Sequence, residues 1–320
     1  MNGRRMFALL LAALAIIGLA LWLAGREPGH TSRVGEPVLP ALQANLNAVR
    51  EIRLGKGDGS AVTLRRRDTD WEVAQRGYTA DSGKVRKLLL DLAALAVRAE
   101  KTSEPANYSR LGVEDADSPT AGSVAVAVAA AEQNWQLLVG KQDSPRAGFV
   151  RVPDQAVSLL AEPLIIVELD PKRWLDRQLL DRAATSVRSV TVIPLEGPAY
   201  TVQRDNAGQA DMTLADMPPK AKLAAPGAAN SAADALAGLA FDDVRKPDST
   251  TNGKTGRATF AFFDNGTLTI AGRREGEQSY LSIISASDPA LAARSKGWEY
   301  EVPGWKFDQL FKARDAILAR

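Results

Sequence analysis

The sequence contains no cysteine, which excludes disulfides, thiolate catalysis and cysteine zinc sites. It contains a single histidine, His30, so a catalytic triad or a multi-histidine metal site could draw on only this one residue. His30 lies in the Gly/Pro-bearing stretch GREPGHTSRVGEP, where a solvated linker histidine is the simpler interpretation.

Motifs that identify common enzyme classes are also missing. The chain has neither GxxxxGK[ST] nor GxSxG. Its one glycine cluster, Gly55–Gly59, lies between two predicted strands and is typical of a hairpin turn. Two serine–lysine pairs, Ser82 with Lys84 and Ser295 with Lys296, have no recognisable motif around them. We therefore expect no catalytic residues, no metal site and no cofactor, with an unrecognised hydrolase as the least favoured alternative.

Charge excess of one sign is absent as well. The chain has 40 basic and 38 acidic residues, and Arg4 and Arg5 are the only charges before Gly25. The remainder is therefore balanced, whereas nucleic-acid-binding proteins usually carry a basic excess on one face. The sequence predicts no nucleic-acid partner.

One long apolar run is present, from Met6 to Ala24, and it contains no charge. As a helix it would span roughly 28 Å, close to the hydrocarbon thickness of a bilayer. Arg4 and Arg5 precede it, which predicts a cytoplasmic N-terminus and an exported remainder. Trp22 stands where a cleavage site would need small residues, which favours an uncleaved anchor. A cleaved signal peptide and a cytoplasmic C-terminal part are the alternatives.

The exported part contains an internal repeat. Residues 49–68 and 187–206 align without a gap, and both read as strand, glycine-bearing turn and strand. The identical pairs are Val49/Val187, Arg50/Arg188, Gly59/Gly197, Ala61/Ala199, Thr63/Thr201 and Arg66/Arg204.

This repeat defines the expected domain organisation. We predict an anchor over residues 1–24, a linker over 25–45, a first repeat over 46–186 and a second over 187–320. Hairpins joined by short turns favour mainly antiparallel sheets with a few helices, an α+β fold in two tandem, duplicated domains behind a transmembrane helix.

Helices are expected at equivalent places in the two repeats. Asp81 is a candidate N-cap in the amphipathic stretch DSGKVRKLLLDLAALAV, and ANSAADALAGLAFDDV supplies its counterpart. Each repeat should close with an aromatic-bearing helical piece, PKRWLDRQLLD in the first and PGWKFDQLFKARDAIL in the second. Strands are predicted at SVAVAVAAA, NWQLLVG and GFVRV, and at RATFAFF, TLTIAGR and SYLSII.

The polar stretch KTSEPANYSRLGV, residues 101–113, is the most distinctive local segment. Structurally, Ser103 can cap a short helix that ends at Gly112, with Tyr108 packed on the sheet. Functionally, Asn107, Tyr108 and Arg110 are the candidate partner contacts.

The sequence resembles the uncharacterised bacterial family known as domain of unknown function 4340. The resemblance is carried by AVTLRRRDTDWEV, YTADSGKVRKLLLDLAAL, AEKTSEPANYSRLGVEDA and DPKRWLDRQLL, in that order. It covers roughly residues 45–185 well and the second repeat weakly. It implies an anchored envelope protein of the inner membrane, with its domains in the periplasm. It also implies association with an ABC-type permease and auxiliary membrane proteins, similar to gliding-motility transport systems. It assigns no catalytic residue.

The leading hypothesis is a non-enzymatic accessory subunit of an ABC-type transport complex. The alternative is a periplasmic module that binds envelope glycan or a lipid-like substrate. Five tryptophans, at positions 71, 135, 174, 298 and 305, could serve as its stacking platforms.

Overall fold

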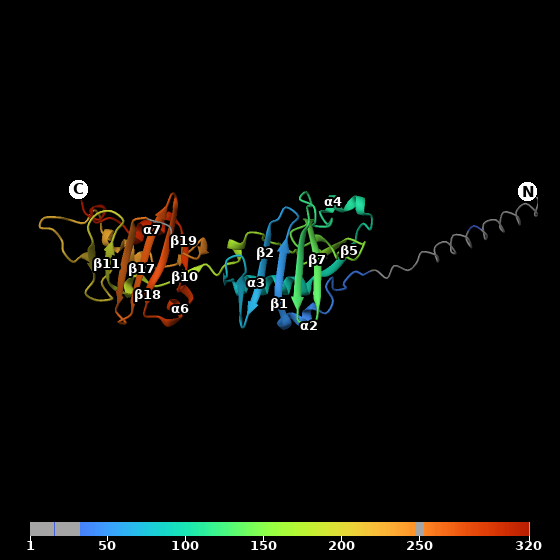
Figure 1. Cartoon of the computed structure of the whole chain (residues 1–320), viewed down its shortest axis with the longest axis horizontal. Coiled ribbons are helices and arrows are strands. Elements are labelled where there is room, and N and C mark those ends of the chain that lie inside the picture. The colour runs from blue at the N-terminus through green and yellow to red at the C-terminus, as the bar shows by residue number, and fades with distance from the viewer. Residues whose placement is uncertain (1–15, 17–32, 248–252, 320) are drawn as a thin grey trace, which may run out of the picture.

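The structure is a computed structural model that describes residue 16, residues 33–247 and residues 253–319. Two antiparallel sheets lie one after the other along the longest axis of the molecule (Figure 1). The predicted α+β class, with mainly antiparallel sheets and few helices, is confirmed.

The first domain is built on a nine-stranded sheet in the order β4-β3-β2-β1-β6-β7-β8-β9-β5. Its strands are β1 Val49–Gly55, β2 Ala61–Arg67, β3 Asp70–Val73, β4 Tyr78–Thr79, β5 Ala96–Glu100, β6 Val124–Ala130, β7 Asn134–Gln142, β8 Gly148–Arg151 and β9 Leu159–Glu162. Its helices are α2 Leu42–Asn45, α3 Ser82–Ala94 and α4 Tyr108–Leu111, with short 3₁₀ turns at Leu46–Ala48, Pro105–Asn107 and Pro171–Trp174.

The second domain is built on an eight-stranded sheet in the order β13-β12-β11-β16-β17-β18-β19-β15. Its strands are β11 Val187–Ile193, β12 Tyr200–Gln203, β13 Thr213–Leu214, β15 Asp243–Arg245, β16 Thr255–Phe262, β17 Thr267–Glu275, β18 Gln278–Ala286 and β19 Glu299–Val302, and a separate pair joins β10 Gln178–Leu180 to β14 Leu239–Ala240. Its helices are α5 Ser231–Asp234, α6 Pro289–Ser295 and α7 Gly304–Leu310, with 3₁₀ turns at Ala184–Ser186, Ala228–Asn230 and Arg314–Ala316.

The two sheets repeat the same strand order, apart from the extra β4. In both first hairpins the register is equivalent, with Ile52 opposite Leu64 and Val190 opposite Val202. Both first strands also shift register against the next strand at the same point, after Val49 and after Val187. The strand–turn–strand pattern predicted for both copies is therefore confirmed at the level of single residue pairs.

The amphipathic helix predicted after the first hairpin is confirmed as α3. The Asp81 carboxylate accepts hydrogen bonds from the backbone N–H groups of Gly83 at 3.0 Å and Lys84 at 3.1 Å, which satisfies two free donors of the first turn. The helix buries Val85, Leu88, Leu89, Leu92 and Ala93.

Two predicted helical pieces are mostly wrong. In the second repeat only Ser231–Asp234 is helical, and residues 239–240 and 243–245 are strands instead. In the first repeat PKRWLDRQLLD forms one 3₁₀ turn and then β10. The physical reason is shared: β10 and β14 pair with each other, and this long-range backbone pairing outweighs weak local helix propensity. The closing helix of the second repeat is confirmed as α7.

The predicted linker over residues 25–45 is not a free spacer where the structure describes it. The Gly35 N–H donates to the Val97 carbonyl at 2.8 Å, and the Val38 N–H donates to the Leu95 carbonyl at 2.8 Å. Val38, Leu39 and Leu42 are buried. Residues 35–38 therefore run along the β5 edge of the first sheet, and α2 packs against α3. Burial of the apolar side chains in residues 38–42 favours this docked arrangement over a solvated linker.

The predicted anchor, with Met6, Trp22 and Ala24, lies outside the described residues. Among those that are described, no helix combines the length and the apolar character needed to cross a membrane.

Candidate functional site

The stretch 101–113 is a compact, well-anchored turn. A 3₁₀ turn leads into α4, which ends at Gly112 in the left-handed conformation (φ 69°), as predicted. Ser103 is not the cap: the Thr102 hydroxyl accepts from the Glu104 N–H at 3.1 Å instead. The helix therefore starts later than predicted. The chain first forms a turn closed by the Thr102 hydroxyl and then the 3₁₀ turn that begins at Pro105.

The three predicted contact residues are close in space but differ in exposure. Tyr108 is buried, and its hydroxyl donates to the Ala156 carbonyl. Asn107 is half-buried, and its amide donates to the Glu104 carboxylate at 3.0 Å. Arg110 is exposed. Tyr108 is thus a structural residue, and only Asn107 and Arg110 offer side-chain atoms to a partner.

A buried arginine that sequence reasoning missed holds the end of this turn. The Arg151 side chain, on β8, is almost fully buried and donates to the carbonyls of Val113 at 2.9 Å and Pro153 at 3.0 Å. It also pairs with the Asp115 carboxylate, and its guanidinium lies 4.5 Å from the Tyr108 ring centroid. Only tertiary structure brings these residues together, since nothing in the local pattern around Arg151 predicts burial.

The tryptophans give little support to a stacking platform. Trp71, Trp135 and Trp174 are buried. Indole N–H groups of the latter two donate to the carbonyls of Pro40 and Glu168 at 2.9 and 2.8 Å. Trp305 is 59% exposed, so it is the tryptophan best placed to meet a ligand.

The most extensive constellation is the contact between the two domains, which we call the seam. Its apolar part gathers around Tyr78 of β4, whose ring lies edge-on to Phe241, Trp298 and Tyr300 of the second domain. The ring centroids are 5.2–5.9 Å apart, which is the favourable range for edge-to-face pairs. The buried apolar residues of both domains consequently form one continuous cluster.

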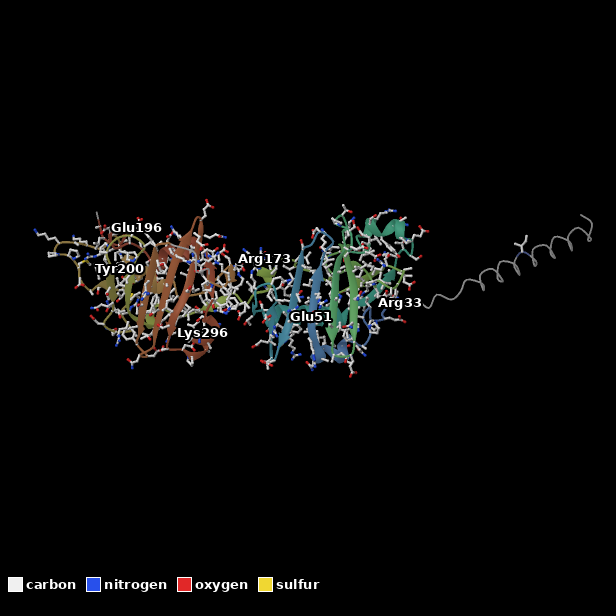
Figure 2. The ribbon with its side chains drawn as sticks, in the orientation of Figure 1. Arg33, Glu51, Arg173, Glu196, Tyr200 and Lys296 are labelled. Atoms are coloured by element: carbon white, nitrogen blue, oxygen red, sulfur yellow. The ribbon has the colours of Figure 1, made fainter. Side chains whose placement is uncertain are left out.

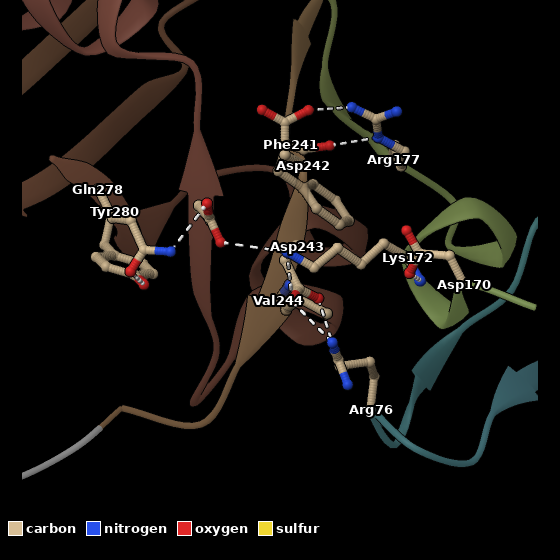
Figure 3. Close-up of polar contacts among 11 residues, drawn as sticks. Arg76, Asp170, Lys172, Arg177, Phe241, Asp242, Asp243, Val244, Gln278 and Tyr280 are labelled. Carbon is tan, nitrogen blue, oxygen red and sulfur yellow. Dashed lines mark hydrogen bonds and ion pairs between the residues drawn. The ribbon is translucent and has the colours of Figure 1, made fainter. Parts of the chain in front are cut away.

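The polar part of the seam is centred on Asp243 (Figure 3). Arg76 donates to both of its carboxylate oxygens, from Nε at 2.6 Å and from Nη2 at 2.9 Å. Lys172 Nζ lies 3.3 Å from the same carboxylate. Planar, two-pronged arginine–carboxylate pairs are among the strongest charge-assisted contacts.

Where the chain passes from the first domain to the second, two consecutive residues are hydrogen-bonded to the two domains in turn. On the first-domain side, the Asp176 N–H donates to the Thr79 carbonyl at 3.0 Å. On the other side, the carbonyl of the very next residue, Arg177, accepts from the Phe241 N–H at 3.1 Å. The Arg177 side chain also donates back to the Phe241 carbonyl at 2.7 Å (Figure 3). Backbone pairing of this kind fixes the two domains relative to each other, in contrast to a flexible linker.

The seam should depend on pH through Asp243. Burial by itself would raise the pKa of Asp243, but hydrogen bonds from Arg76 and the Val244 N–H, with the charges of Arg76 and Lys172, lower it below its ordinary value of 3.8. A lowered pKa in the folded state means that the ionised carboxylate stabilises the fold at neutral pH, and that this contribution is lost as the pH falls below about 4.

We therefore expect Asp243→Asn to lower the free energy of unfolding at pH 7 and to have a smaller effect at pH 3. Urea denaturation across this range measures the difference, with Asp117→Asn at an exposed site as control. An effect of Asp243→Asn that is equal at both pH values would contradict the assigned role of the charge.

In the part of the chain that the structure describes, no three His, Cys, Asp or Glu side chains are grouped to hold a metal ion.

Comparison with known proteins gives one family. No curated protein and no solved structure gave a significant match. Residues 71–256 match the family described as "Domain of unknown function (DUF4340)". The match begins in β3 and ends in β16, so it starts later than the sequence resemblance does, extends into the second domain, and includes most of the seam. The chain belongs to this family of unknown function, DUF4340.

Proposed function

We propose that this protein is a non-enzymatic, membrane-anchored envelope protein that acts as an accessory subunit of an ABC-type transport complex. The anchor is the apolar run from Met6 to Ala24, with the N-terminus in the cytoplasm and both domains in the periplasm. Its partners would be the permease and auxiliary membrane proteins of the complex.

The observation that supports this proposal best is the arrangement of the two domains. The chain enters at one end of the molecule, and the seam holds the second domain to the first. The chain enters the folded part near Arg33, at the end of the first domain that faces away from the second (Figure 2). The second domain therefore lies farthest from the point of entry (Figure 1). A protein tethered at this end and rigid at its seam would hold its second domain at a set distance from the membrane, which suits a spacer or docking subunit.

The alternative, a periplasmic module for envelope glycan or a lipid-like substrate, has less support. It depends on exposed aromatic platforms, and three of the five tryptophans considered for that role are buried. Trp305 would be its main contact.

Cross-linking of the full-length tagged chain, followed by purification in mild detergent and mass spectrometry, tests the proposal. We expect permease and ATPase subunits to be recovered with the full chain. They should be lost with a truncated chain that starts at Thr31 and is exported by a cleavable signal, since it retains the docked segment 35–45 but lacks the anchor. Recovery of the protein alone, with the exported part binding glycan or lipid, would overturn the proposal in favour of the alternative.

A further inference from the structure

A stretch of the first domain has the features of a strand that lacks a neighbour. Residues 164–169 follow β9 and belong to no helix, strand or turn. Between Leu164 and Val167, no backbone hydrogen bond to any other described residue is formed. Exposure alternates along the stretch, from 5% at Ile165 to 78% at Ile166, as it does along a strand with one buried face.

A hollow of about 370 Å³ lies beside this stretch, between it and helix α3. Its apolar walls come from both sides, with Leu88 on the helix and Leu164 and Ile166 on the stretch. The Trp174 ring lines it as well, and its N–H is held by the Glu168 carbonyl. Ile166 is the most exposed large apolar side chain in the domains, and its position at a hollow distinguishes it from scattered surface residues.

Charges of both signs line the hollow, the basic Lys84, Lys87 and Arg173 and the acidic Asp91 and Glu168. Lys87 is neutralised by Asp91, whose carboxylate lies 2.6 Å from its ammonium group. Lys84 donates to the Arg173 carbonyl at 2.8 Å and lies 4.0 Å from the Asp81 carboxylate, so this lysine is also engaged within the chain. Arg173 is exposed and forms no ion pair with any other described residue, so its guanidinium can donate hydrogen bonds to an incoming carboxylate.

We propose that this groove binds an extended peptide segment of a partner protein, added as a strand to the backbone of residues 164–167. In such recognition the main-chain hydrogen bonds supply affinity, and alternate side chains enter pockets that supply specificity. The peptide would place apolar side chains against Leu88 and Ile166 and an acidic residue against Arg173. This rests on the proposed function for the partner's identity, but the peptide binding itself requires only the folded chain.

The test uses the full-length chain in lipid nanodiscs and fluorescent peptide pools of about eight residues, in which Val, Leu or Phe alternates with Ser or Thr. One pool carries Asp or Glu at one end, a second carries Lys there, and laurate is a separate probe. We expect the acidic pool to bind and to slow amide hydrogen exchange of residues 164–167. Ile166→Asp should weaken binding by about 10-fold or more, and Arg173→Glu should shift preference toward the basic pool.

The matched control is Ile284→Asp, which changes an equally large exposed residue in the second domain and should leave binding unchanged. Binding of laurate without binding of either peptide pool would overturn the proposal, as would peptide binding that leaves the exchange of residues 164–167 unaltered. Failure of the transport-complex proposal would show in the cross-linking experiment alone, so the two outcomes are distinguishable.

Discussion

Replacement of Tyr300 by alanine is expected to lower the free energy of unfolding by about 3–5 kcal/mol, the usual cost of deleting a large buried aromatic side chain. Tyr300 is fully buried at the seam, where its ring centroid lies 5.0 Å from that of Phe241 and 5.9 Å from that of Tyr78. Its hydroxyl also lies 3.4 Å from the Tyr78 hydroxyl. The deletion therefore removes contacts both within the second domain and between the domains. Urea denaturation monitored by tryptophan fluorescence measures the loss.

A double-mutant cycle isolates the part of this effect that belongs to the seam. Tyr78→Ala combined with Tyr300→Ala should show a coupling energy of about 1 kcal/mol, as found for aromatic pairs. The control is Tyr200→Ala, which removes another buried tyrosine of the second domain whose hydroxyl donates to the Lys312 carbonyl, away from the seam. Tyr78→Ala and Tyr200→Ala should be additive. Additivity in both pairs would mean that the domains do not stabilise each other through these rings.

Loss of the seam should also change the cooperativity of unfolding. With an intact seam the two domains share one apolar cluster, and we expect them to unfold in one transition. In Tyr78→Ala the second domain should unfold separately from the first. Limited proteolysis should then cut near Asp176, where the chain crosses between the domains.

Replacement of Arg151 by alanine is expected to cost about 3 kcal/mol, because it leaves the carbonyls of Val113 and Pro153 without their donors and removes the stacking partner of Tyr108. Arg151→Lys should recover only part of this loss, since an ammonium group cannot reproduce the fork of donors. Urea denaturation gives the energies. Hydrogen exchange should show faster opening of residues 101–113 in the alanine variant.

Arg146→Ala is the matched control for this prediction. The Arg146 side chain is 83% exposed and forms one surface ion pair, with Glu162 at 2.9 Å, so its loss should change stability by about 0.5 kcal/mol or less. A small effect of Arg151→Ala, similar to that of Arg146→Ala, would mean that the other contacts of the turn, such as those of Tyr108 and Lys141, hold it without Arg151.

Much of the local structure follows from the sequence. Alternating apolar residues predicted both first hairpins, and Gly59 and Gly197 occupy the same left-handed turn position at φ 90° and 93°. Asp81 predicted the start of α3, and Gly112 the end of α4. Asp288, followed by Pro289 at the first position of α6, is an equivalent helix-start signal in the sequence.

Other features arose only from contacts between distant residues. Whether residues 178–180 would be helix or strand depended on β14, about sixty residues later in the chain, which supplies the backbone partners. The burial of Arg151 depended on the loop that carries Val113 and Asp115.

The sequence by itself determined the antiparallel α+β character, the internal repeat and the family, because periodicity, turn glycines and caps act over a few residues. Only the tertiary structure decided how the repeats are joined. The pairing of Arg76 with Asp243 and the aromatic cluster around Tyr78 are long-range arrangements. The residues that they join are separated by many positions along the chain, so no local sequence pattern predicts them.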